Sequence, residues 1–104
     1  MEVKFRVSWS RAAVQALARL FNINHKMVYS KSKNILSKEP RKKAFGVADY
    51  PGFYLNGYFW ILINNVVIIY RVSDEQKRVF IDACYYANTE ETVQIFWGIE
   101  PDED

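Results

Sequence analysis

The chain has 104 residues, of which 50% are hydrophobic, 25% charged and 16% aromatic. This length supports one hydrophobic core, and the composition excludes an intrinsically disordered chain, which would have few aromatic residues and a large net charge. The single cysteine, Cys84, and the single histidine, His25, exclude an internal disulfide and a metal site built from several cysteines or histidines. We therefore expect one domain over residues 1–99, an acidic tail at 100–104, no metal and no small-molecule cofactor.

The sequence predicts a cytoplasmic protein that is not associated with a membrane. A lone cysteine is typical of a reducing compartment. The longest apolar stretch, near Tyr58–Tyr70, is interrupted by Asn64 and Asn65, so it is too short and too polar to span a bilayer as a helix. The first residues also lack the apolar stretch of a signal peptide.

The net charge of +2 conceals a strong asymmetry between the two halves of the chain. Residues 1–52 carry eleven basic and three acidic side chains, a balance of +8, whereas residues 53–104 carry three basic and nine acidic side chains, a balance of −6. This polarity predicts a positive face for a polyanion or an acidic protein, although a single lysine-rich helix is more often only a solvated surface. The run Arg41-Lys42-Lys43 favours a binding function, because three adjacent cations repel one another.

The first part of the chain predicts one strand and one helix. Residues 2–8 alternate between apolar and polar side chains, which is the period of a half-buried strand. Ser10 is a typical N-cap for the helix that follows, and Asn22 is expected to stop that helix. The residues expected on its buried face are Val14, Leu17, Ala18 and Phe21.

A second helix is expected to begin after Asn22 or Asn24 and to run to about Lys38, with Pro40 ending it. Its apolar side would carry Met27 or Val28, and then Ile35. Two helices so close in sequence form an antiparallel hairpin. A basic connector then leads to a turn at Pro51-Gly52.

From residue 53 onward the sequence predicts β-structure joined by short turns. The expected strands are residues 53–63, 66–72 and 78–87, with a fourth at 93–99. Asn64-Asn65 is a two-residue turn that tolerates positive φ. The element order is β-α-α-β-β-β, so we expect an α+β fold in which the helix hairpin covers one face of an antiparallel sheet of three or four strands.

Basic residues and tyrosines are the groups left to carry chemistry. We interpret His25 as a surface histidine and Cys84 as a core residue. A metal-free ribonuclease needs a base for the 2′-hydroxyl, cations for the charged transition state and an acid for the leaving oxygen. Lysine, arginine and tyrosine supply these groups only where the fold brings them together. The tyrosines that could stack on bases, if they are not simply packed on the sheet, are Tyr50, Tyr54, Tyr58, Tyr85 and Tyr86.

One motif resembles a known family. The run Val67-Ile68-Ile69-Tyr70-Arg71-Val72, the acidic turn at 73–77 and Val79-Phe80-Ile81 are similar to a segment of the RelE/ParE toxin superfamily. The order of the elements and the basic connector are also similar to that family. The resemblance implies the toxin of a type II toxin–antitoxin pair, neutralised by a cognate antitoxin. RelE-like members cleave mRNA on the ribosome, and ParE-like members inhibit DNA gyrase.

The resemblance also implies roles for particular residues. In the ribonuclease branch, basic residues after the second helix, arginines on the sheet and a carboxy-terminal tyrosine or histidine carry the chemistry. By this resemblance the catalytic residues are Lys42, Lys43, Arg71 and Tyr85, and the nucleic-acid-binding residues are Lys33, Lys38, Arg41 and Tyr86. The expected activity is that of a RelE-like, ribosome-dependent mRNA endoribonuclease.

Three departures from the family pattern leave other functions open. The middle strand reads Phe59-Trp60-Ile61-Leu62 where the family usually has an arginine. The next strand starts with Val66-Val67 where the family usually has Tyr-Arg, and the last strand ends in Tyr85-Tyr86 where the family usually has a His-Arg or Arg-Arg pair. A ParE-like toxin acting on gyrase or another protein is one alternative. A non-toxic binding module of the same fold is the other. For Arg71, a structural ion pair with Asp74 or Asp82 is the alternative role.

Overall fold

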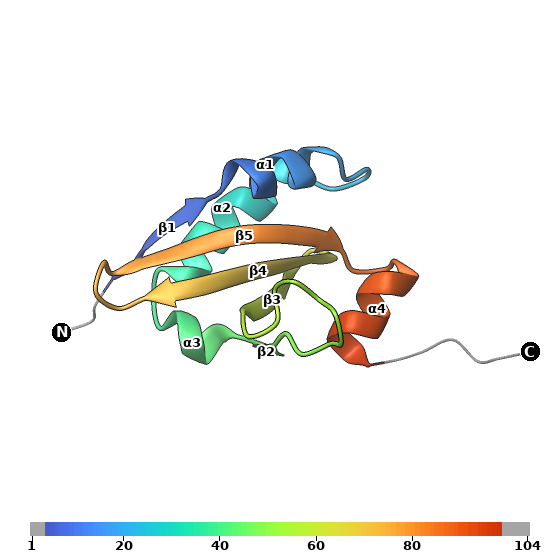
Figure 1. Cartoon of the computed structure of the whole chain (residues 1–104). Helices are drawn as coiled ribbons and strands as arrows, with labels where there is room; N and C mark the ends of the chain where they lie inside the picture. Colours follow the sequence, from blue (N-terminus) through green and yellow to red (C-terminus); the bar gives the residue numbers. More distant parts are fainter. Residues whose placement is uncertain (1–3, 99–104) are drawn as a thin grey trace, which may run out of the picture.

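The computed structural model describes residues 4–98 as a five-stranded sheet with helices on both faces (Figure 1). The elements are β1 (Arg6–Trp9), α1 (Arg11–Ala18), α2 (His25–Leu36), α3 (Pro40–Lys43), β2 (Gly46–Val47), β3 (Phe59–Ile63), β4 (Val66–Ser73), β5 (Arg78–Tyr86) and α4 (Glu90–Trp97). The strands lie in the order β1-β5-β4-β3-β2; β1 is parallel to β5, and the other neighbours are antiparallel. The expected α+β architecture is confirmed, and the acidic tail lies outside the described residues.

Local signals in the sequence set several element boundaries as expected. The Ser10 hydroxyl accepts a hydrogen bond from the Ala13 amide at 3.0 Å, and the Asn24 side chain accepts one from the Met27 amide at 3.0 Å. These bonds satisfy amide groups that have no partner inside the helix. In the β3–β4 turn, Asn64 and Asn65 adopt positive φ values of 48° and 65°, as a two-residue hairpin turn requires.

The buried faces of α1 and α2 match the expected ones only in part: Leu17 and Val28 were expected to be buried and are. In α1 the residues that reach the core are Ala13 and Leu17, whereas Val14 is 44% exposed and Phe21, beyond the end of the helix, is 87% exposed. The apolar residues of this segment form two adjacent stripes, and packing on the sheet selects the stripe of Ala13. The buried face of α2 consists of Val28, Ser32 and Leu36.

The expected strand at 93–99 is wrong, because the segment forms α4. The Thr89 hydroxyl accepts a hydrogen bond from the Thr92 amide at 3.2 Å and caps the helix. At the other end Gly98 adopts a φ of 65°, and its amide donates to the Gln94 carbonyl at 3.1 Å. A glycine in this left-handed conformation is a common helix stop.

Other helix and strand boundaries differ by a few residues from those expected from the sequence. β1 begins at Arg6, and Lys4 forms only an isolated bridge with Lys38. Residues 53–58 lie in turns, so β3 begins at Phe59. Helix α2 ends at Leu36, and Pro40 begins α3 rather than terminating α2. Proline fits the first turn of a helix because the amide there needs no intrahelical partner.

The sheet has a core on each face. On the first face α1 and α2 pack over residues such as Ile68, Tyr70 and Ile81. On the second face α4 and the loop before β3 pack over residues such as Trp60 and Ile69. Figure 1 shows α2 behind the sheet, α1 above β5 at the top of the view and α4 near the end of β5. The part of the second face beside the β4–β5 turn stays uncovered by helices of the described chain, and we call it the open face.

None of the helices within residues 4–98 has the length and apolar character needed to cross a membrane.

Candidate nucleic-acid interface

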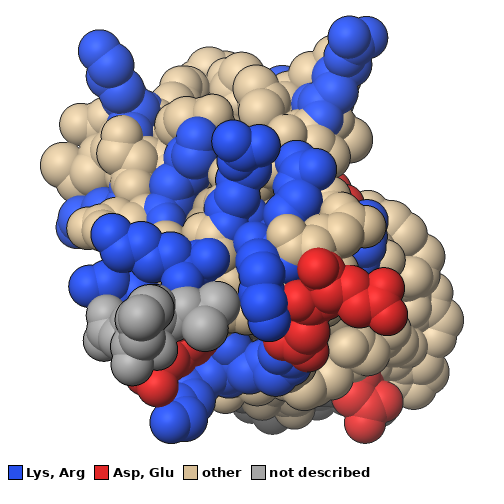
Figure 2. All heavy atoms as spheres, turned by 90° about the vertical axis from the view of Figure 1, so that its left-hand side faces the viewer, with Lys and Arg blue, Asp and Glu red and all other residues tan. Residues whose placement is uncertain are grey.

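Basic side chains gather at the end of the molecule that holds the β4–β5 turn, as Figure 2 shows. Backbone contacts assemble this end from distant segments. Lys4 bridges to Lys38 beyond α2, and the Arg6 amide donates to the Lys77 carbonyl at 2.9 Å. We define the basic end by its residues, which are Lys4, Arg6, Lys38, Arg41, Lys42, Lys43 and Lys77. This assembly explains how the positive first half of the chain forms a positive surface.

Each cation of α3 has a different partner. Arg41 donates two hydrogen bonds to Asp74, at 2.8 and 2.7 Å, and thereby links α3 to the β4–β5 turn. These bonds hold the pKa of Asp74 below its ordinary value. Lys42 pairs with Glu39 at 3.3 Å, and its side chain is 78% exposed. The Lys43 ammonium donates to the carbonyls of Ile35 and Lys38, both at 3.4 Å. A cation there complements the carboxyl end of α2.

The structure separates the predicted catalytic lysines from the predicted catalytic arginine. The Tyr70 hydroxyl donates to the Pro40 carbonyl at 2.6 Å, and Tyr70 belongs to the core under α1 and α2. Helix α3 therefore begins on the helix-covered face. Arg71 is the next residue of β4, so its side chain points to the opposite face. Lys42 and Lys43 thus lie on a different side of the sheet from Arg71.

Arg71 and Tyr85, in contrast, share the second face. A β-bulge shifts the β4–β5 register between Ile69 and Tyr70. Cys84 consequently joins the first core, while Ala83 and Tyr85 join the second. Regular alternation along β5 would place Cys84 on the same face as Phe80, and the bulge moves it to the opposite face. Tyr85 pairs with Val67, which is four residues before Arg71 and so about 13 Å away along β4.

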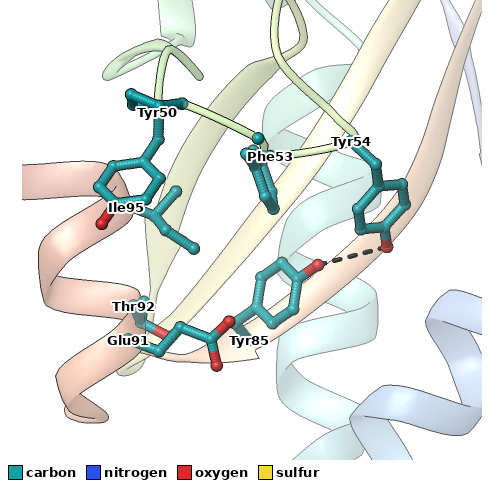
Figure 3. Close-up of a pocket in the computed structure, with 9 residues that line it drawn as sticks. Tyr50, Phe53, Tyr54, Tyr85, Glu91, Thr92 and Ile95 are labelled. Carbon is teal, nitrogen blue, oxygen red and sulfur yellow. Dashed lines mark hydrogen bonds between the residues drawn. The ribbon is translucent and has the colours of Figure 1, made fainter.

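Tyr85 lies at the wall of a cavity of about 350 Å³ between the loop before β3 and α4 (Figure 3). Its hydroxyl lies 3.3 Å from the hydroxyl of Tyr54, and burial followed by this hydrogen bond raises the pKa of Tyr85 above its ordinary value. Tyr50, Phe53 and Glu91 line the same cavity. Aromatic walls with polar groups at the edge suit a planar ring such as a nucleobase.

Arg71 and its neighbours form a second cluster on the open face. The Nε atom of Arg71 lies 3.4 Å from a carboxylate oxygen of Asp82, which is one of the two structural pairings anticipated for it. Both Arg71 and Arg78 lie over the ring of Phe80. Sequence reasoning did not select Arg78, Phe80 or Asp82 as functional residues. The only signal was their alternation in residues 78–82, which predicts that they share a face.

The remaining predicted nucleic-acid-binding residues are dispersed. Lys33 lies on α2, with its ammonium 5.0 Å from the centre of the Tyr29 ring. Lys38 belongs to the basic end. Tyr86 follows Tyr85 in β5, so its side chain points to the other face. Arg41, as described above, is held by Asp74. The predicted set is therefore not one contiguous surface.

The lone cysteine and the lone histidine have structural partners. Cys84 is 3% exposed, and burial raises the pKa of its thiol to about 12, as expected for a core residue rather than a nucleophile. An imidazole nitrogen of His25 lies 2.7 Å from the Leu20 carbonyl, where it closes the turn between α1 and α2.

A separate apolar groove of about 270 Å³ runs between α1 and α2. Its lining includes Val14, Leu17, Ala18 and Tyr29, with Lys26 at its edge. All of its lining residues lie within residues 4–38, which contain no acidic residue, so the charge of the lining comes from Lys26. This surface combines exposed apolar side chains with a positive rim, which is the pattern of a protein-interaction site.

The fold matches chains from two solved toxin–antitoxin complexes. One chain of the RelBE2 complex from Mycobacterium tuberculosis is 24% identical with a TM-score of 0.62, and the match covers 81% of this chain and 92% of that chain. One chain of the intact E. coli RelBE complex is 17% identical with a TM-score of 0.52, over 83% of this chain and 99% of that chain. No family model and no curated protein matches the sequence. The RelE-type fold expected from the sequence motif is therefore confirmed.

Proposed function

We propose that the protein is the toxin of a type II toxin–antitoxin pair and that it cleaves mRNA on the ribosome. The observation that carries this proposal is the fold, which extends over nearly the full length of chains from two toxin–antitoxin complexes. The second support is that Arg71 and Tyr85 share a face of the sheet, with Tyr85 at the wall of an aromatic cavity and Arg71 about 13 Å farther along β4.

Cleavage without a metal assigns one task to each of three groups. The Tyr85 phenol carries its proton at neutral pH, as any tyrosine with a pKa of about 10 or above does, so it can protonate the leaving oxygen. The carboxylate of Glu91, which lines the same cavity, can accept the proton of the 2′-hydroxyl. Arg71 binds a neighbouring phosphate of the same RNA strand, since it lies about 13 Å farther along β4. Lys42 and Lys43 bind the flanking RNA from the basic end.

The test is induced expression in bacteria without any partner, with growth, translation and mRNA integrity followed together. We expect growth arrest with a rapid loss of translation and cut mRNA. Tyr85→Phe should abolish mRNA cutting, because it removes the proton donor and retains the ring. Tyr58→Phe is the matched control: it removes a hydroxyl from another half-buried tyrosine beside the same core, and it should stay toxic.

Two results would contradict mRNA cleavage. Growth arrest with translation intact at first would indicate a ParE-like action on gyrase or another protein. Expression without any arrest would favour a non-toxic binding module of the same fold. An active Tyr85→Phe variant would remove Tyr85 from the mechanism while leaving the toxin function in place.

The partner implied by this function is a cognate antitoxin, and the groove between α1 and α2 is the surface that fits it. Val14 and Tyr29 expose 44% and 39% of their surface at this apolar groove, whose rim is basic. An amphipathic helix with acidic flanks complements both properties. Ala18→Glu should therefore prevent rescue of growth by a coexpressed antitoxin and leave toxicity unchanged. Rescue at the normal level would place the antitoxin elsewhere.

A further inference from the structure

Two arginines share one aromatic ring on the open face. The guanidinium carbon of Arg71 lies 4.1 Å from the centre of the Phe80 ring, and that of Arg78 lies 5.0 Å from it. Both distances are within the range of a cation–π contact. Because a guanidinium stacks on a ring with its N–H groups directed outward, the one ring orients the hydrogen-bond donors of both arginines.

A polar anchor further fixes each guanidinium. Arg71 Nε pairs with Asp82 at 3.4 Å, and an Nη atom of Arg78 donates to the Ser8 hydroxyl at 2.8 Å. The Arg71 side chain is 51% exposed, and its Nη atoms have no hydrogen-bond partner among residues 4–98. Two anchored cations with unused donors are therefore present before any ligand arrives, which lowers the entropy cost of binding.

The charges of this cluster do not balance. Two guanidinium groups face a single carboxylate, so the cluster carries a local excess of one positive charge. The Asp82 oxygen beside Arg71 and the Nε atom of Arg78 are both buried, and neither has a hydrogen-bond partner within the described chain. Like charges held on one ring repel each other, and an anion with several oxygens would relieve this repulsion by accepting from both arginines.

The β-bulge in β5 connects this cluster to the aromatic cavity. Phe80 and Tyr85 are an odd number of residues apart, so in a regular strand they would point to opposite faces. The register shift leaves Asp82 as the extra residue between Ile81 and Ala83, and Tyr85 therefore returns to the face of Phe80. Bulges commonly redirect side chains next to functional sites. A single strand of nucleic acid lying along β5 would meet the arginines first and the cavity next.

We propose that Arg71 and Arg78, held on Phe80, form a clamp for a backbone phosphate of RNA on the open face. This inference rests on the proposed function for the identity of the anion as RNA. It adds a binding role for Arg78 and for the Phe80 ring, and it makes Asp82 the residue that positions Arg71. The clamp holds the RNA strand so that the adjacent nucleotide reaches the cavity at Tyr85.

The test measures binding of a short fluorescent oligouridine RNA to the full chain by anisotropy over a range of salt concentrations. Arg71→Gln and Arg78→Gln should each weaken binding about tenfold. Each should also reduce the slope of log affinity against log salt, and the loss of both arginines should reduce it by about 0.7, the value for the one phosphate on a single strand that they share. Arg11→Gln removes the same charge from the exposed start of α1, and it should bind like the wild type.

A third variant keeps the test decisive if Arg78→Gln does not fold. Phe80→Leu retains an apolar residue and both charges but removes the aromatic surface, so it should weaken RNA binding without a change in circular dichroism. Normal binding by a folded Arg71→Gln and a folded Phe80→Leu would overturn the clamp and leave the toxin function intact. Weak binding by both variants, in a protein that does not arrest growth, would support the clamp and overturn the toxin function. A wild-type chain that does not bind the RNA at low salt would overturn the clamp.

Discussion

Tyr70 illustrates how one buried polar atom joins two segments that are distant in sequence. Its side chain is fully buried, and its hydroxyl donates to the Pro40 carbonyl at 2.6 Å. The bond ties the start of α3 to the central strand β4. The sequence places Tyr70 in a buried strand but does not show where its hydroxyl binds, because the partner lies thirty residues away. Ser32 is a similar case: its hydroxyl accepts from the Trp9 indole at 2.9 Å.

Removal of the Tyr70 hydroxyl should destabilise the protein. Tyr70→Phe leaves the Pro40 carbonyl without its partner, so the free energy of unfolding should fall by about 1–2 kcal/mol. Urea denaturation at neutral pH measures the change. Tyr58→Phe, at a half-buried residue of the other core, should change stability by less than about 0.5 kcal/mol. Equal effects of the two substitutions would contradict a special role for the Tyr70 bond.

The Cys84 thiol should make stability fall at high pH. Burial raises its pKa from 9.0 to about 12, so above pH 9 the unfolded chain loses a proton that the folded chain retains. The free energy of unfolding should therefore decrease with rising pH, approaching about 1.4 kcal/mol per pH unit for this one group. Cys84→Ala should remove the part of the decrease that begins near pH 9. The decrease from Tyr70 and Tyr85, whose pKa values are also raised, begins near pH 10. An unchanged slope between pH 9 and 10 in Cys84→Ala would contradict this.

At the scale of the elements, α4 depends on its caps and on aromatic packing. Trp60 on β3 contacts Phe96 and Trp97 of α4, with ring centres 5.3 Å apart in both pairs. The helix has only eight residues, too few to be stable alone. Its caps and its contact with the sheet therefore have to act together, and the cavity at Tyr85 exists only while α4 is docked.

Loss of the amino-terminal cap should loosen α4 from the sheet. Thr89→Ala removes the hydrogen bond to the Thr92 amide and should cost about 1 kcal/mol of local stability. Tryptophan fluorescence should shift to longer wavelength, since Trp60 and Trp97 gain contact with water, and RNA cleavage should decrease with it. Ser37→Ala, a change just beyond α2, is the control. Fluorescence and activity that both stay unchanged would show that α4 holds its place without the cap.

Some of these elements were predictable from the sequence and others were not, for physical reasons. Ser10, Asn24 and the Asn64-Asn65 turn act within a few residues, so local pattern predicts them. The helical period of α1 fits two faces, and only the sheet decides that Ala13 is buried and Val14 exposed. For α4, Thr89 and Gly98 were helix signals that the apolar residues between them obscured.

In the candidate site, too, some features were predictable from the sequence and others depend on tertiary packing. Arg71 was selected through a family motif. Its contact with Phe80 and the common face of Phe80 and Tyr85 depend on the register of β4 and β5 and on the bulge at Asp82. Such a register shift has no signature in residues 78–87, because alternation continues through it. The sequence therefore predicts which residues are candidates for the site, but not which of them lie in contact in the folded protein.

At the scale of the whole molecule, the positive charge and the candidate chemistry lie on different sides. The basic end contains Lys42 and Lys43 on the helix-covered side, while Arg71 and Tyr85 occupy the second face. In the proposed function, a long RNA contacts both surfaces by passing around the β4–β5 turn. The basic end then contributes affinity and a faster approach of the polyanion, and the second face contributes the chemistry.

The separation of the basic end from the second face predicts different kinetic effects for Lys42 and Lys43 on the one hand and for Tyr85 on the other. Lys42→Gln combined with Lys43→Gln should raise the concentration of mRNA-loaded ribosomes needed for half-maximal cleavage and should reduce the salt dependence. The maximal rate should change little, because the proposed function has the lysines bind RNA away from the bond that breaks. Tyr85→Phe should instead lower the maximal rate by about 100-fold or more, the usual loss for a missing proton donor. Cleavage of mRNA on purified ribosomes over a range of ribosome concentrations separates the two effects. A large fall in maximal rate for the double lysine variant would mean that the bound ribosome brings α3 to the reacting phosphate, and the lysines would then be catalytic as the family resemblance implies.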